Sequence, residues 1–149
     1  MSQPASLVQQ LRELTGAGVM ECKRALEDAA GDMEKAKKLI AERGLASVGK
    51  RSERETGAGL LKTYVHNNRI GVLLEIRAET DFVVRSDPFQ QLAQELVMQI
   101  AAVEVESVED LLKQLYVRDE SKTVDILVKE VIAKVGENVR ITRFARFAL

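Results

Sequence analysis

The chain has few side chains of the types that enzymes use as nucleophiles, bases or metal ligands. His66 is the only histidine and Cys22 the only cysteine, so the usual zinc ligand sets and an internal disulfide are excluded. We interpret His66 as a polar residue beside a turn and Cys22 as a small core residue. No glycine loop ending in Lys-Ser or Lys-Thr is present to bind a nucleotide's phosphates. The sequence therefore predicts a protein that is not an enzyme and that holds no metal or cofactor.

Two segments instead have the features of surfaces that bind another protein. The first, Leu11 to Lys23, is typical of a helix, a glycine turn and a second helix. Val19 and Met20 are adjacent and project about 100° apart on a helix, so both cannot lie centrally in a core. At least one is a candidate for exposure near the turn, where apolar groups can mark a docking site.

The second segment, Glu79 to Ser86, connects a strand pattern to the start of a helix and carries Phe82 beside Asp81. Two interpretations of this aromatic residue stay open. Residue chemistry alone favours Phe82 folding back onto the core, as apolar residues usually do. The alternative is an exposed probe that inserts into a partner.

The elements that position the first segment are three predicted short helices within residues 1–45. Leu7, Leu11 and Leu14 recur on one face of the first helix. The third helix is expected to begin after Asp32, a good N-cap, and to end at Gly44. Residues 46–56 are rich in charge and lack an apolar pattern, so we expect a linker there.

The second segment is positioned by a predicted α+β domain over residues 57–149. Alternating apolar residues over 60–65 and 70–78, joined through Asn67–Arg69, predict a β-hairpin. Residues 139–147 would add a third antiparallel strand. We expect helices from Asp87 as N-cap, from Ser107, and over 124–135. The predicted fold class is α+β, with a helical bundle followed by a small antiparallel sheet that has helices packed on one side.

Charge and hydropathy restrict the partners and the compartment. Lys and Arg number 22 against 23 Asp and Glu, so we expect no direct contact with nucleic acid. No apolar run approaches the roughly 20 residues of a membrane-spanning helix, and no signal peptide is visible. We therefore expect a cytoplasmic protein without a membrane contact.

Three motifs in the same order resemble those of the elongation factor Ts family: Leu11–Lys23, Thr80–Val83, and Lys134–Val139 leading to Arg143-Phe144. The resemblance covers nearly the whole chain. It implies a three-helix domain similar to ubiquitin-associated domains over 1–45 and a core domain over 57–149. It also implies a partner, the GTPase elongation factor Tu in its GDP form, and a role as guanine-nucleotide exchange factor in translation elongation.

The resemblance further implies how the two segments act. The aromatic residue of the tip would insert into the partner near its nucleotide and disturb the magnesium and phosphate contacts, so that GDP leaves. The implied residues are Thr80, Asp81, Phe82 and Val83 at the tip, and Arg12, Val19 and Met20 at a docking surface on the GTPase domain.

The chain also departs from the family pattern. Position 19 is Val where many relatives have Met, and residues 104–122 form a shorter stretch than in the family. With one core unit, the chain is expected to form a non-covalent homodimer. Ala145 stands where some short relatives have a cysteine that links the dimer. The alternative function is a docking module that binds through the helical bundle and has lost exchange activity; Phe82 would be exposed in an exchange factor.

Overall fold

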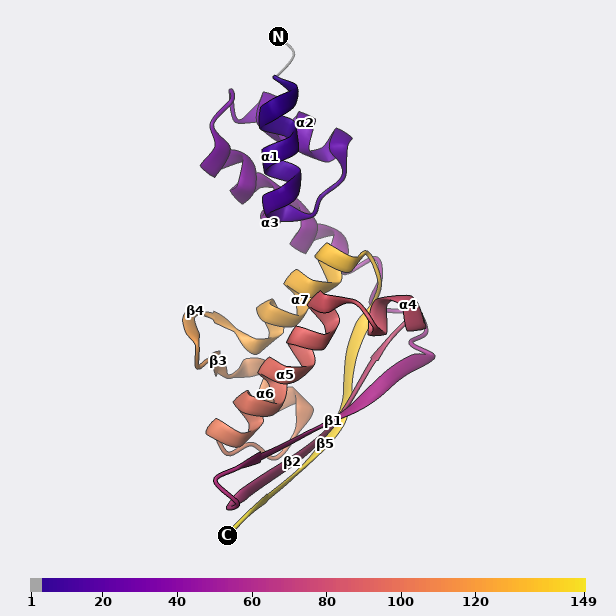
Figure 1. The fold of residues 1–149 in the computed structure, drawn as a ribbon, viewed down its shortest axis with the longest axis vertical. Helices are drawn as coiled ribbons and strands as arrows, with labels where there is room; N and C mark the ends of the chain where they lie inside the picture. Colours follow the sequence, from indigo (N-terminus) through magenta and orange to yellow (C-terminus); the bar gives the residue numbers. More distant parts are fainter. Residues whose placement is uncertain (1–3) are drawn as a thin grey trace. The chain divides into compact units, whose positions relative to one another are not determined.

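The computed structural model describes residues 4–149. Its contacts divide the chain between Lys50 and Arg51 into two units, which we describe separately. The chain path through both units can be followed by colour in Figure 1.

Three helices form the N-terminal unit: α1 (Ala5–Thr15), α2 (Val19–Asp28) and α3 (Met33–Val48). Gly16, at φ 71°, ends α1 and donates its N–H to the Arg12 carbonyl, while the Asp32 carboxylate caps α3 by accepting from the Lys35 N–H. Cys22 is fully buried in the core between these helices, as predicted.

Two expectations for this unit are wrong. α3 does not end at Gly44 but continues to Val48, because one glycine costs a helix only about 1 kcal/mol relative to alanine and good helix formers surround it. The helix thus reaches into the expected linker. Leu14, expected on the inward face of α1, is 61% exposed.

The C-terminal unit is built on an antiparallel sheet in the order β1-β2-β5, formed by β1 (Ala58–His66), β2 (Ile70–Ala78) and β5 (Val139–Ala148). The predicted hairpin and third strand are confirmed. Asn67 and Asn68 make the turn with φ of 50° and 58°, a left-handed conformation that asparagine tolerates.

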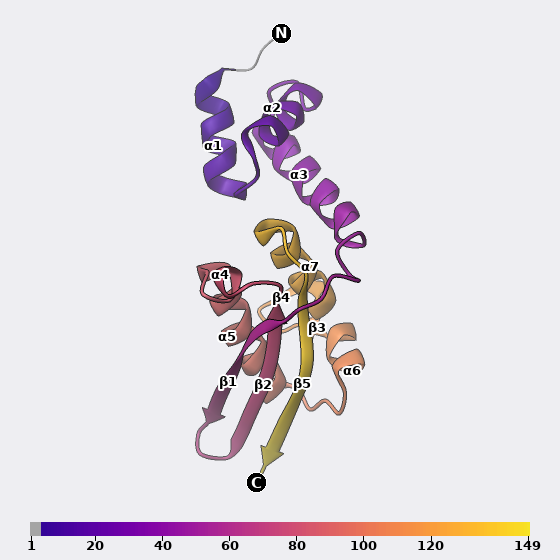
Figure 2. The same cartoon turned by 90° about the vertical axis from the view of Figure 1, so that its right-hand side faces the viewer.

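Helices cover one face of this sheet, in agreement with the predicted α+β class. They are α5 (Asp87–Ala102), α6 (Val108–Lys113) and α7 (Val124–Val135), and they lie behind the sheet in Figure 2. The N-cap of α5 is Ser86, one residue before the expected Asp87. A one-turn helix that the sequence did not predict, α4 (Asp81–Val84), follows β2 directly.

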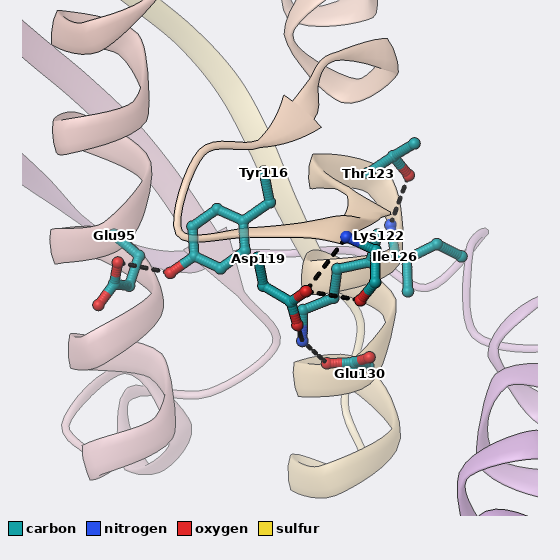
Figure 3. Close-up of polar contacts among 8 residues, drawn as sticks. Glu95, Tyr116, Asp119, Lys122, Thr123, Ile126 and Glu130 are labelled. Carbon is teal, nitrogen blue, oxygen red and sulfur yellow. Dashed lines mark hydrogen bonds and ion pairs between the residues drawn. The ribbon is translucent and has the colours of Figure 1, made fainter.

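A small hairpin, β3 (Leu115–Tyr116) and β4 (Asp119–Thr123), lies between α6 and α7 and was also not predicted. Its attachment to α5 is polar, as Figure 3 shows for Tyr116, whose hydroxyl donates to the Glu95 carboxylate at 2.6 Å. The fully buried Gln99 side chain accepts from the Val117 N–H and donates to the Leu115 carbonyl. Strands of two and five residues are too short to show the alternation of apolar and polar residues that predicts a strand.

Candidate functional site

The first candidate surface surrounds the turn between α1 and α2. Val19 is 49% exposed and Met20 60% exposed, so both adjacent apolar side chains face solvent, where the sequence required only one. Arg12 is also exposed. Leu14, which shares a predicted helix face with Leu7 and Leu11, is exposed as well. We call Arg12, Val19 and Met20, the three residues predicted to dock, the docking surface.

The structure separates the predicted docking residues into two neighbouring hollows. Arg12 and Val19 line the hollow between α1 and α2, together with Val8 and Lys23. Met20 instead borders a second hollow with acidic and basic side chains of α2 and α3. The first hollow combines apolar walls with the charged side chains of Arg12, Lys23 and Glu13.

The second candidate surface is the tip that follows β2, formed by Thr80 and α4. Thr80 is the N-cap of α4, and its hydroxyl oxygen accepts from the Val83 N–H at 3.3 Å. Phe82 is 85% exposed, and Asp81 beside it is exposed as well. The exposure expected of an exchange factor is therefore confirmed, and the interpretation of Phe82 as a core residue is wrong.

Burial of the neighbouring side chains explains why Phe82 points outward. Val83 is 5% and Val84 7% exposed, and successive residues of a helix project about 100° apart. Once the two valines face the core, Phe82 must face away from it. Beyond α4, the Ser86 hydroxyl donates to the Val83 carbonyl and the Gln90 amide to the Val84 carbonyl. The tip is thus a short helix tied down at both valines.

One residue that contacts the tip was missed by sequence analysis. The Glu137 carboxylate accepts from the Thr80 N–H at 3.0 Å and from the Thr80 hydroxyl at 2.8 Å. Glu137 lies within the Lys134–Val139 motif, which had been interpreted only as the approach to a strand. The two residues are 57 positions apart, and only the pairing of β2 with β5 brings them together.

A cluster of charged side chains borders the tip on the sheet face away from the helices. Asp81 shares a shallow hollow with Glu75, Arg77 and Arg143. Hydrogen bonds from Arg77 and then from Arg143 hold the pKa of Glu75 below its usual value. Glu75 pairs with both Arg77 and Arg143, so one carboxylate faces two guanidinium groups in this hollow, and Asp81 lines it as a second carboxylate.

The side chains that could bind a metal ion are scattered over residues 4–149. Within this range, no group of three or more His, Cys, Asp and Glu side chains could hold a metal ion. His66 is exposed next to the β1–β2 turn and pairs with the Tyr64 hydroxyl at 2.9 Å. The helices described over the same residues include none with the length and apolar character needed to cross a bilayer.

Comparisons with known proteins agree on one family. The family model described as "Elongation factor TS" matches residues 79–149, which include the tip and Glu137. An elongation factor Ts of Nostoc sp. is 46% identical over 146 residues, which cover 97% of this chain and 46% of the relative. The chain thus spans less than half of that relative. A chloroplastic polyprotein of EF-Ts from Oryza sativa is 38% identical over 191 residues, and the chain spans 17% of it.

Other relatives match along nearly their whole length. An elongation factor Ts of Thermosipho melanesiensis is 38% identical over 191 residues, which cover 97% of this chain and 97% of the relative. One of Coprothermobacter proteolyticus is 41% identical with the same coverage. Because these alignments are longer than this chain, both relatives contain positions that it lacks.

Proposed function

The chain belongs to the elongation factor Ts family, and from this premise we propose that it is a guanine-nucleotide exchange factor for elongation factor Tu in translation elongation. It binds the GTPase in its GDP form and accelerates release of GDP. It is a binding protein and makes or breaks no covalent bond.

The observation that carries the proposal is the 85% exposure of Phe82 on a helix whose neighbouring valines are buried. An aromatic side chain so exposed contributes little to the stability of its own fold. Held on a short, tied-down helix, it can enter a pocket of a partner at a small entropic cost. Phe82 is the wedge, Asp81 its polar neighbour, and Thr80 and Val83 hold the tip.

Thermodynamic linkage explains how such a protein releases a ligand it does not bind. A protein that binds the nucleotide-free GTPase more tightly than the GDP-bound form must, reciprocally, weaken GDP binding. It needs no phosphate-binding loop of its own. The magnesium ion that stabilises the phosphates belongs to the partner, and disturbing it weakens GDP binding because the ion is the largest local charge.

The docking surface supplies affinity for the partner's GTPase domain. Arg12, Val19 and Met20 are exposed on the N-terminal unit and bind the partner's GTPase domain. Two of these side chains are apolar and lose solvent on binding, which supplies the favourable free energy. Loss of this contact weakens the complex but leaves the wedge itself unchanged.

We also propose a non-covalent homodimer that forms through the open face of the sheet. On this face, opposite α5, Leu61 is 64% exposed, Val65 62%, Leu73 42% and Phe147 79%. Such an apolar sheet face is typical of a face-to-face contact between two sheets. Sedimentation equilibrium at high micromolar concentration tests this, and a monomer there would count against the dimer.

The function is tested by stopped-flow release of a fluorescent GDP analogue from elongation factor Tu with and without the chain. We expect release to accelerate as the chain is added and then to reach a plateau. Release that stays at the spontaneous rate at every concentration of folded chain would refute the proposal. A cytoplasmic location stays a prediction, since the relatives include a chloroplastic elongation factor Ts.

A further inference from the structure

The loop between α7 and β5 places a carboxylate against the tip. Gly136, at φ 76°, ends α7 in a left-handed conformation, and Glu137 follows it before β5 begins. Its side chain lies against the end of β2, where Thr80 starts the tip. Both oxygens of this carboxylate are used, one on the Thr80 N–H and one on the Thr80 hydroxyl.

The bond to the hydroxyl decides how Thr80 caps α4. A threonine hydroxyl has one hydrogen and two lone pairs. Because the hydrogen points to Glu137, a lone pair is left to accept from the Val83 N–H. The Glu137 carboxylate therefore acts on the cap of α4 through Thr80, and it does so with charge-assisted hydrogen bonds, which are stronger than neutral ones.

A second carboxylate makes the matching contact in the opposite direction. Glu79 accepts from the Asn138 N–H at 3.1 Å, so each segment donates a backbone N–H to the other's carboxylate. Asn138 is only 4% exposed, and its side-chain amide donates to the Arg54 carbonyl at 2.9 Å. We call Glu79 and Glu137 the carboxylate clamp; it continues the pairing of β2 with β5 beyond the last ladder residues.

The tip depends on such support because it is a helix of only four residues. A single helical turn fixes several backbone angles for very few hydrogen bonds and is unstable alone. The buried valines hold one side of α4 and the Ser86 and Gln90 bonds hold its end, whereas the clamp holds its beginning. The buried valines turn Phe82 outward, and the clamp holds the start of the helical turn that carries it.

We propose that Glu137 is a positioning residue of the tip: through Thr80 it fixes the start of α4 and thereby the direction of Phe82. This inference rests on the proposed exchange function for its consequence, although the effect on α4 can be measured without the partner. Glu137 need not touch the partner or its nucleotide.

The first test is amide hydrogen exchange in the intact chain carrying Glu137→Gln. A glutamine offers one acceptor oxygen where glutamate offers two, so one Thr80 donor loses its acceptor. We expect exchange at the Val83 and Val84 amides to become roughly tenfold faster, which is a shift of about 1.4 kcal/mol in the local opening equilibrium. Unchanged exchange at both amides would overturn the proposal.

The matched control is Glu95→Gln, which also removes a carboxylate that accepts two hydrogen bonds, here from the side chains of Tyr116 and Arg118 near the small hairpin. This change should lower the unfolding temperature yet leave exchange at Val83 and Val84 as in the unaltered chain. If both variants speed this exchange alike, Glu137 acts only on general stability and the proposal fails.

The second test separates positioning from docking in the GDP-release assay. For Glu137→Gln we expect the release rate at saturating chain to fall about tenfold, while the half-saturating concentration stays within twofold. In a double-mutant cycle, Thr80→Val and Glu137→Gln should be strongly non-additive, because both act on the contact between Thr80 and the Glu137 carboxylate. Additive effects, or a change confined to the half-saturating concentration, would refute positioning through Thr80.

The two proposals fail in different ways. If the unaltered chain does not accelerate GDP release, the exchange function is wrong, and the amide exchange of α4 still decides whether Glu137 fixes the tip. If release is accelerated and amide exchange is unchanged by Glu137→Gln, the exchange function stands and the positioning role is wrong.

Discussion

Tyr116→Phe removes one hydroxyl from the attachment of the small hairpin to α5 and keeps the ring. The hydroxyl donates at 2.6 Å to the Glu95 carboxylate, a bond drawn as a dashed line in Figure 3, and both residues are 8% exposed. A hydrogen bond to a charged group contributes about 1.5–3 kcal/mol. Since Arg118 still pairs with Glu95 in the variant, we expect the lower end, about 1.5 kcal/mol.

Differential scanning calorimetry measures this loss. For a unit of roughly 100 residues, about 4 °C is lost per kcal/mol, so the unfolding temperature of the C-terminal unit should fall by about 6 °C. The transition of the N-terminal unit should not move. An unfolding temperature within 1 °C of the unaltered chain would refute the view that this bond holds the hairpin.

The same bond predicts a pH dependence with a definite sign. Burial first, and then the hydrogen bond to the Glu95 carboxylate, raise the pKa of Tyr116 from 10.0 to about 12. Because the folded pKa lies above the unfolded one, the stability that Tyr116 contributes is fully present below pH 10 and is lost as the pH rises from 10 to 12. Over this range the stability gap between the unaltered chain and Tyr116→Phe should shrink; a gap that widens would contradict the assignment.

Two further substitutions test the docking surface and the sheet. Met20→Ala truncates a residue that is 60% exposed, so we expect thermal unfolding and the maximal GDP-release rate to stay unchanged. The half-saturating concentration should rise about fivefold, which corresponds to about 1 kcal/mol of binding free energy. Glu42→Ala, at an exposed position of α3, is the control, and an equal rise in both variants would refute the docking role. Gly59→Ala would put a methyl group 2.7 Å from the Ile76 carbonyl oxygen and should destabilise the C-terminal unit by about 1–3 kcal/mol, whereas Gly57→Ala meets nothing within 4 Å and should not. Calorimetry compares the two glycine variants, and equal unfolding temperatures would contradict the close approach.

The sequence predicted the long periodic elements well and the short ones poorly. The β1–β2 hairpin and α7 have apolar repeats over nine or more residues, which report directly on a buried face. α4 and β3 have four and two residues, too few for any period to be visible. Gly44 was wrongly predicted to end α3, because a glycine at a helix-compatible position lowers the stability of the helix without ending it.

The site residues also differ in whether local or long-range contacts determine their position. Exposure of at least one of Val19 and Met20 follows from helix geometry, whereas Thr80 could not be predicted as a cap because α4 itself was not predicted. For Phe82, residue chemistry alone favoured the core, and only family resemblance reversed that expectation, because its direction depends on Val83 and Val84 being buried. Glu137 could not be assigned at all, since its contact with Thr80 exists only after β2 and β5 have paired.

The most direct test of the wedge is the rate of GDP release from elongation factor Tu at saturating concentrations of the chain and of Phe82→Ala. Truncating a side chain that is 85% exposed should leave far-ultraviolet circular dichroism and thermal unfolding unchanged. Loss of a central aromatic contact, about 2 kcal/mol or more, predicts a release rate at least roughly 30-fold lower than with the unaltered chain. A folded Phe82→Ala variant that accelerates GDP release as fast as the unaltered chain would contradict the account.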